Sequence, residues 1–422
     1  MRARPFTQAA AALLIATAGW HWMLALSGAS AVTGVATCPA VPAGTLSFAC
    51  NSACPVNDPC LGVALPTPSS GARACRCFTT DSSSDGNPTM LTFLIPFGAY
   101  KSPQELADPT TTMPVLQGGD DTDKYAWASN DELTSIDQWN LSSSITTVAI
   151  RGGSSVNGAV KKQVANVNIS DNFLLGQSEV ASLTLANLNL ETLADTITQK
   201  LPKSLTFLDL SNDLLTVFPP AVPKLTNLQT LNLSYNFITQ VDKSSEMRIL
   251  TTLHLNVNNL QSFTAVFPKL TLLDLRVNNL SKIPETIAQH SFLKTLRLGK
   301  NKLQQVDQAS IPDSVTSLSL FSNALTSFDV YYPNLIVLDL NDNLLTEFPL
   351  TIFKHTKLKM LFVQSNQPLK KVSFTNEQAN FLYNLNSLQI DASNLLKDCE
   401  ASNKYTLEKF NVTFCIDGHH RS

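Results

Sequence analysis

The chain has 422 residues, of which 44% are hydrophobic and 15% are charged, and its formal net charge is −3. A slightly acidic chain offers no overall attraction for nucleic acid or for an anionic membrane, so this charge excludes the strongly basic classes of binding protein.

The N-terminus has the pattern of a secretory signal peptide. Arg2 and Arg4 form a positive start, an apolar run follows over residues 9–26, and small residues up to Ala31 suit signal peptidase. We therefore predict a signal peptide over residues 1–31 and a secreted, extracellular mature chain. The alternative is an uncleaved membrane anchor, because the uncharged stretch reaches about 20 residues.

The cysteines favour an oxidising compartment, because all eight lie in two groups at the ends of the chain. If those ends are separate modules, Cys399 and Cys415 form a disulfide in a C-terminal cap and tail over residues 399–422. The other group lies in a cysteine-rich module over residues 32–80, and its pairing is open among fifteen arrangements. This group consists of Cys38, Cys50, Cys54, Cys60, Cys75 and Cys77. Its spacings differ from the paired C-x-x-C of zinc modules, so we expect no metal.

Residues 81–140 are rich in Thr, Ser, Asp and Pro, and we interpret them as a polar linker followed by an N-terminal cap. An apolar run over residues 90–97 predicts a strand that covers the first repeat. Trp127 and Trp139 are candidate anchors for this cap.

The strongest feature is a block of 65 residues that recurs from Leu205, Leu270 and Leu335. Each complete block contains three units of the form L-x-x-L-x-L-x-x-N, with 20 to 23 residues from one unit to the next. A short period of this kind indicates a solenoid. We predict a repeat array over residues 141–398.

One unit shows why the array must stack. Leu231 and Leu233 point to the same side of a short strand, and Leu228 and Ile238 flank them. Each buried aliphatic side chain contributes about 1.5 to 3 kcal/mol, but only when neighbouring units cover it. We therefore expect that a single unit does not fold alone.

The last position of the motif is predicted to form a ladder of asparagine side chains. An amide both donates and accepts, so it can pair backbone groups that the tight chain reversal would leave buried without partners. Asp213 occupies the first place in this column and cannot donate when ionised. The ladder consists of Asn236, Asn258, Asn278, Asn301, Asn323, Asn343 and Asn366.

Weaker units extend the array at both ends. They begin at Ile145, Val164 and Val180 on one side and at Leu385 on the other, which gives about twelve strands in all. With neighbouring strands about 4.8 Å apart, the sheet would be roughly 50 to 55 Å long.

The run from about Ile145 to Leu395 resembles a leucine-rich repeat domain, and seven units carry the full pattern. This resemblance implies an α/β curved solenoid, with a parallel sheet on the concave face and short helical or extended segments on the convex face. Members of the family mostly bind proteins or peptides. The layout is similar to secreted repeat proteins of eukaryotic microbes and to the ectodomains of receptor-like kinases.

Binding residues are expected at the outward positions of the concave strands, because the inward positions form the core. Arg276, Arg297 and Lys300 should form a cationic cluster beside Phe321, a composition typical of binding hot spots. The alternative is an ordinary solvated sheet face whose charges pair across strands. The candidate ligand-binding residues are Tyr235, His254, Asn256, Asp274, Arg276, Arg297, Lys300, Phe321, Asp339, Asp342 and Phe362.

A hydrolase triad is the catalytic alternative, because Asp209, His254 and Asp274 share this face with Ser234 nearby. Residues two units apart lie about 10 Å apart across the sheet, beyond hydrogen-bonding distance. No strained turn or Gly-rich oxyanion loop accompanies the serine, and the sequence has no kinase motif, phosphate-binding loop or zinc-protease helix. We expect no catalysis and no cofactor.

Five N-x-[ST] sequons fit an extracellular chain. Asn168 and Asn232 should face outward from the concave sheet, where a glycan would obstruct binding. We therefore predict glycosylation at Asn140, Asn279 and Asn411.

Two interpretations of function remain. The first is a free secreted protein that binds a protein or peptide, and it is favoured because the tail from Phe414 to Ser422 is too polar for an anchor. The second is the ectodomain of a receptor-like kinase whose membrane segment and kinase lie outside this chain. Nucleic acid is not an expected partner. Membrane contact is expected only with an uncleaved N-terminal segment or a receptor fragment.

Overall fold

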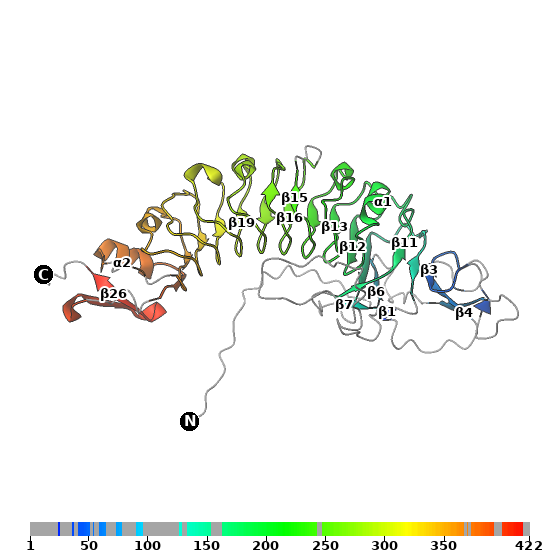
Figure 1. The fold of residues 1–422 in the computed structure, drawn as a ribbon, viewed down its shortest axis with the longest axis horizontal. Helices are drawn as coiled ribbons and strands as arrows, with labels where there is room; N and C mark the ends of the chain where they lie inside the picture. The colour runs from blue at the N-terminus through cyan, green and yellow to red at the C-terminus, as the bar shows by residue number, and fades with distance from the viewer. Residues whose placement is uncertain are drawn as a thin grey trace, which may run out of the picture.

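The computed structural model shows a curved solenoid, as predicted, in which the strands line the inner side of an arch (Figure 1). Helix α1 (Ala194–Gln199) and strand β15 (Gln240–Val241) lie on the outer side. The structure describes residues 24–25, 36–37, 41–50, 54, 59–64, 73–77, 90–95, 126–128, 133–152, 163–242, 247–366, 369, 373–391 and 399–416.

The concave side is one sheet of 13 strands that all pair in parallel. Each turn of the solenoid adds one strand. The repeats supply β9 (Thr147–Gly152), β12 (Ser182–Ala186), β13 (Phe207–Asp209), β14 (Thr230–Asn232), β16 (Thr252–His254), β18 (Leu272–Asp274), β19 (Thr295–Arg297), β20 (Ser317–Ser319), β21 (Val337–Asp339), β22 (Met360–Phe362) and β24 (Ser387–Gln389).

Two further strands complete the sheet at its N-terminal end. β6 (Met90–Ile95) pairs with β9, where the apolar run over residues 90–97 predicted a covering strand. β1 (Leu24–Ala25) pairs with β6 and lies within the range predicted as a signal peptide. Cleavage of residues 1–31 would therefore leave β6 as the first strand of the sheet.

The prediction of twelve repeat strands on the concave side is wrong at the unit that begins at Val164. β9 pairs directly with β12, whereas β10 (Gln163–Ala165) pairs with β7 (Ala126–Ala128) in a separate sheet. The reason is spacing, because only 16 residues separate Val164 from Val180, too few for a turn of 20 to 23 residues. The segment is part of one long turn.

The cysteine-rich region forms a second sheet together with one strand that precedes β9 and one strand of that long turn. β3 (Thr45–Ser47) lies between β4 (Cys60–Ala64) and β8 (Ser135–Ile136), and the order of the whole sheet is β11-β8-β3-β4-β5-β2. Its remaining strands are β2 (Ala36–Thr37), β5 (Arg73–Cys77) and β11 (Asn168–Ile169). Trp139 is fully buried between the rings of Phe48 and Phe173 and joins this sheet to the array.

A small cluster joins Val41 to four cysteines of the cysteine-rich region, and the main apolar core follows the solenoid from Leu46 to Ile416. Leu231, Leu233, Leu296 and Leu298 are fully buried in it, as the alternation of side chains requires. Among the described residues of the repeats, the convex side consists of α1, β15, β17 (Ser262–Phe263) and four short 3-10 helices. These helices are η2 (Val222–Lys224), η3 (Glu285–Gln289), η4 (Gln308–Ser310) and η5 (Leu350–Lys354).

The asparagine column forms a continuous hydrogen-bonded ladder. The Asn236 amide oxygen accepts from the backbone N–H groups of Asp213 and Leu215, both at 3.0 Å. Its Nδ2 donates to the carbonyl oxygens of Leu210 and Leu233, at 2.8 and 3.1 Å. The same contacts recur along the column, so the ladder pairs buried backbone groups of adjacent turns.

The C-terminal end of the core is covered by a small cap. Helix α2 (Asn376–Tyr383) precedes the last repeat strand, and the sheet β23-β26-β25 combines one strand before this helix with two strands after β24. These strands are β23 (Ser373–Phe374), β25 (Lys404–Leu407) and β26 (Val412–Ile416), with η7 (Ala401–Asn403) and η8 (Glu408–Phe410) between them. Within the described residues, no helix has the length and apolar character needed to cross a membrane.

Candidate functional site

The concave face presents side chains in straight columns, because adjacent strands pair residue by residue. At the fifth motif position the order is Asp209, Asn232, His254, Asp274, Arg297, Ser319, Asp339 and Phe362. Neighbours in the column are about 4.8 Å apart.

The structure brings three predicted residues into one ion-pair network. Arg276 Nε and Nη2 donate to the Asp274 carboxylate at 2.9 and 2.6 Å, and Arg297 Nη1 donates to it at 3.3 Å. The Asp274 side chain is 1% exposed, whereas those of Arg276 and Arg297 are 37% and 39% exposed. The predicted cationic cluster is therefore anchored on a buried carboxylate that neutralises part of its charge.

The two arginines keep Asp274 ionised. Burial opposes ionisation of this carboxyl, but the hydrogen bonds and charge of Arg276, with the charge of Arg297, outweigh burial and lower its pKa. The same carboxylate raises the pKa of Arg276. The shared carboxylate therefore holds both guanidinium groups in place on the exposed face.

Lys300 and Phe321 follow β19 and β20, the next two strands of the sheet after β18. Lys300 is exposed and has a positive φ of 53°. The Phe321 ring lies over Gly299, where an added Cβ would be only 2.1 Å from the ring. Glycine is therefore required for the ring to lie flat on the sheet beside the arginines.

The predicted acidic residues lie further along the sheet and are anchored by serines. Asp339 accepts hydrogen bonds from the Ser319 hydroxyl and the Asn341 backbone, both at 3.2 Å, and burial raises its pKa. Asp342 is exposed and accepts from the Ser322 hydroxyl. Asp339 is two strands from Arg297, so these acids do not belong to the arginine network.

The remaining predicted residues lie at the two ends of this region. Phe362 follows Asp339 in the column, and Tyr235, His254 and Asn256 are half-buried on the N-terminal side. The pKa of His254 is lowered, mainly because the ring is partly buried, and the Asp274 carboxylate opposes that shift.

The third motif position also faces outward and was missed by the sequence analysis. It carries Leu272, Val337 and Met360, all half-buried, with Val337 and Met360 paired on adjacent strands. The alternation that places position five outward applies equally to position three. Arg151 was also missed, and it lies 3.6 Å from Asp209 across the intervening strand β12.

The residues considered for a hydrolase triad make other contacts. The Ser234 hydroxyl donates to the Asn232 amide oxygen at 2.7 Å, and Asp274 is engaged by the arginines. This arrangement orients the asparagine side chain and gives the serine no base.

Comparison with known proteins matches a family model described as leucine rich repeat over residues 203–260. Toll-like receptor 2 of Equus caballus is 29% identical over 205 residues, which cover 47% of this chain and 23% of the receptor. The Homo sapiens protein named leucine-rich repeats and immunoglobulin-like domains protein 3 is 30% identical over 171 residues, 38% of this chain and 15% of that protein. The chain therefore contains a leucine-rich repeat array.

The chain spans about a quarter or less of the length of these curated relatives. Among solved structures, a leucine-rich repeat protein of Leptospira interrogans has a TM-score of 0.48 and 24% identity. That match covers 59% of this chain and 61% of the other. The relatives are leucine-rich repeat proteins, a family in which binding is the usual role.

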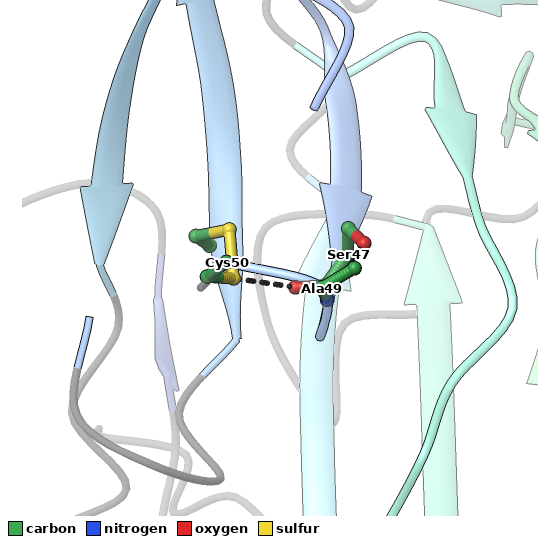
Figure 2. The surroundings of a disulfide bond; sticks show 4 residues. Ser47, Ala49 and Cys50 are labelled. Atoms are coloured by element: carbon green, nitrogen blue, oxygen red, sulfur yellow. Dashed lines mark hydrogen bonds between the residues drawn. A yellow bond between two sulfur atoms is a disulfide. The ribbon is translucent and has the colours of Figure 1, made fainter. Parts of the chain in front are cut away.

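The leucine-rich repeat array is flanked by disulfides at both ends. Cys399 and Cys415 form a disulfide in the C-terminal cap, and Cys50 and Cys60 form one at the N-terminal end of the array. Cys50 Sγ also lies 3.2 Å from the Ser47 carbonyl oxygen (Figure 2). Cys54 lies close to that pair and is itself in a disulfide, as is Cys75. A cysteine in a disulfide has no thiolate to bind zinc, so these sulfurs offer no zinc site. Cys38 and the side chain of Cys77 lie outside the described residues.

The sequons lie in different settings. Asn140 and Asn411 are exposed, and the amide oxygen of Asn279 is buried. Asn168 is exposed on β11, which belongs to the second sheet, so the expectation that it faces the concave side is wrong. Glycosylation at Asn140, Asn279 and Asn411 stays a prediction.

Proposed function

We propose that this leucine-rich repeat protein is an extracellular, non-catalytic module that binds a protein or peptide on its concave face. An acidic group of the ligand would lie against Arg276, Arg297 and Lys300. The apolar part of the ligand would contact Phe321.

The observation that supports this proposal is the pairing of two arginines with one buried carboxylate. Asp274 holds both guanidinium groups in place, while Arg276 Nη1 and Arg297 Nε and Nη2 have no hydrogen-bond partner among the described residues. Donors that are already oriented lose less conformational entropy when a carboxylate binds. The network keeps an excess positive charge, to which Lys300 adds.

An extracellular location is supported by the disulfides at both ends of the array and by the pattern of residues 1–31. Disulfides of this kind persist in oxidising compartments. The Toll-like receptors among the relatives carry the same repeats.

The contacts of the buried Asp274 carboxylate determine which variants can test this site. Replacing Arg276 and Arg297 together with Glu would leave the buried Asp274 carboxylate without a partner, so thermal unfolding would change along with binding. Arg297→Gln with Lys300→Gln is a cleaner variant, because Arg276 continues to pair with Asp274 through two hydrogen bonds. Lys302→Gln is the matched control, since this exposed lysine lies outside the arginine network.

The assay is selection of peptides from a random display library on the immobilised protein, followed by affinity measurements on the variants. Selected peptides should be enriched in Asp and Glu. Loss of charge-assisted hydrogen bonds should weaken them about 10-fold or more in the Arg297→Gln/Lys300→Gln variant and leave the Lys302→Gln control unchanged. Peptides that bind both variants equally would place the site elsewhere, and a library that yields no binder would count against peptide recognition.

The receptor ectodomain is the second candidate, and it is supported by the Toll-like receptors, of which the chain spans 23%. Sequencing the transcript downstream of the codon for Ser422 tests it. An encoded apolar segment of about 20 residues would decide for a receptor, and a stop codon would decide for a free protein.

A further inference from the structure

A second surface lies on one flat side of the arch, where the strands begin. We define this leading edge by three positions of each repeat from Leu205 to Leu385: the two residues before the first apolar residue of the motif and the one after it. Backbone hydrogen bonds link these turns in order, for example from Lys294 to Thr271 and from Lys359 to Ile336. The leading edge is therefore a continuous surface beside the concave face.

The leading edge carries a strong excess of positive charge. Asp313 is its one carboxylate, and the preceding repeat brings Glu179 to the equivalent position. All six of its cations are exposed. They are Lys203, Arg248, Lys269, Lys294, Lys357 and Lys359.

These cations differ from the concave arginines in having no acidic partner among the described residues. Among the described residues, ion pairs engage Arg151, Lys200, Arg276, Lys282 and Arg297, and none involves the leading edge. Lys269 lies over the Phe292 ring at 4.3 Å, and Lys357 donates to the Asn334 amide oxygen at 2.6 Å. Neither contact neutralises a charge.

The same edge exposes large apolar side chains. Ile249, Phe292, Ile336 and Tyr383 are 40%, 48%, 40% and 51% exposed, and they make up four of the nine exposed large apolar residues in the described parts of the chain. Burial of such side chains in a partner is favourable, and lysine stems can lie along apolar surface while their charged ends remain in a polar layer.

This combination distinguishes between two kinds of polyanion. The cations are spread over eight turns, about 34 Å at 4.8 Å per strand, and are interrupted where Asp313 and Asn334 lie. A single linear polyanion would cross that interruption and would gain little from the isoleucines. An anionic bilayer can contact all turns of the leading edge simultaneously, including those on either side of the interruption. Its interface also accommodates apolar side chains beside lysines.

We propose that the leading edge is a peripheral docking surface for an anionic lipid membrane. The arch would lie on its side with the leading edge on the headgroups, and the concave face would stay open to its own ligand. Although the whole chain has a net charge of −3, the membrane would meet only the cationic side.

The test uses the full chain and vesicles of phosphatidylcholine with about one third phosphatidylserine. The variant Lys269→Glu/Lys294→Glu/Lys359→Glu should lower the partition coefficient more than 100-fold, since each cation contributes about fivefold. The control is Lys224→Glu/Lys302→Glu/Lys354→Glu, which makes the same charge change at exposed lysines away from the leading edge and should bind within about twofold of the wild type. Any contribution of residues 9–26 is common to all of these proteins.

Two further measurements keep the test decisive. Ile249→Ser/Phe292→Ser should weaken vesicle binding about 10-fold or more without changing its dependence on salt, because it removes apolar side chains and no charge. All variants should unfold at the wild-type temperature, and Gln in place of Glu repeats the comparison if one does not.

Absence of wild-type binding to anionic vesicles, or equal loss in both lysine variants, would overturn the proposal. Full binding by Ile249→Ser/Phe292→Ser, together with equally tight binding of dextran sulfate, would assign the edge to a soluble polyanion instead.

Discussion

Two buried histidines on the convex side should make the stability of the array depend on pH. His290 and His355 occupy the same place in successive 65-residue blocks and are 0% and 1% exposed. Their Nε2 atoms accept hydrogen bonds from the backbone N–H groups of Phe267 and Tyr332, at 3.2 and 3.1 Å. Their Nδ1 atoms lie close to carbonyl oxygens and therefore carry the hydrogen of the neutral ring.

The first block shows what this contact is for. Its equivalent of His290 is Leu225, and its equivalent of Phe267 is Pro202. Proline has no N–H, so no acceptor is needed there. In the later blocks the buried N–H requires an acceptor, and the histidine ring supplies it.

The sign of the pH effect follows from the shifted equilibrium. Burial lowers the pKa of both rings in the folded state, whereas the unfolded rings titrate near 6.5. Their contribution to stability is therefore complete above about pH 6.5 and is lost as the pH falls below that value. The loss is at most about 1.4 kcal/mol per pH unit for each histidine, or about 2.7 kcal/mol for the pair at pH 5.5.

The assay is urea unfolding followed by circular dichroism at pH 7.5 and pH 5.5, on the wild type and on His290→Leu/His355→Leu. The variant should be less stable at pH 7.5 by about 1 to 3 kcal/mol for each N–H left unpaired. Between the two pH values, however, its midpoint should fall much less than that of the wild type. His254 and the buried aspartates are present in both proteins, so their contributions cancel. An equal fall in both proteins would refute the assigned role.

Two further predictions concern the core of the array. Asp213→Asn should stabilise the protein by about 1 to 2 kcal/mol at neutral pH. The reason is that burial raises the pKa of this carboxyl well above its usual value, and one of its oxygens has no partner among the described residues. The gain, measured as a urea midpoint, should shrink toward pH 4, and a neutral or destabilising effect at pH 7 would contradict the prediction. Leu296→Ala should lower the free energy of unfolding by about 2 to 5 kcal/mol in the same assay, because it leaves a cavity in the fully buried column. The control is Thr295→Ala at the neighbouring outward position, which should lower it little. Equal losses would show that the strand does not separate core from surface.

The repeat pattern was sufficient to predict the sheet, the core and the ladder, because each depends on backbone periodicity. Residues at one motif position must share an environment once the turns stack, so Leu296 and Asn236 could be placed from spacing alone. Val164 shows the limit of this argument. Its local pattern fits a repeat, but the interval to the next unit is too short for a full turn, and the interval decides.

The candidate site could be predicted only in part, because a motif position determines where the Cα atom lies and which face its side chain is on, but not the rotamer of that side chain. The columns placed Asp274 and Arg297 on adjacent strands correctly. They did not reveal that Arg276 folds back onto Asp274 on its own strand, which depends on the rotamer of a long side chain. Val257 and Val277 also have positive φ angles, which their side chains alone would not favour. The asparagine that follows each valine holds the turn in place.

The two cationic surfaces of this protein follow from the same repeat and differ in how their charge is held. On the concave face the arginines lie above a carboxylate that the strand buries, so their positions are fixed and part of their charge is cancelled. On the leading edge the lysines project from turns where no described carboxylate reaches them, so their charge is uncancelled. Among the described residues, only the contacts of Lys269 with the Phe292 ring and of Lys357 with Asn334 restrain them. Fixed and partly neutralised donors suit recognition of one acidic group, whereas adjustable and unpaired ones suit a surface of many negative charges. Increasing salt should therefore weaken vesicle binding at the leading edge more steeply than peptide binding at Arg276 and Arg297.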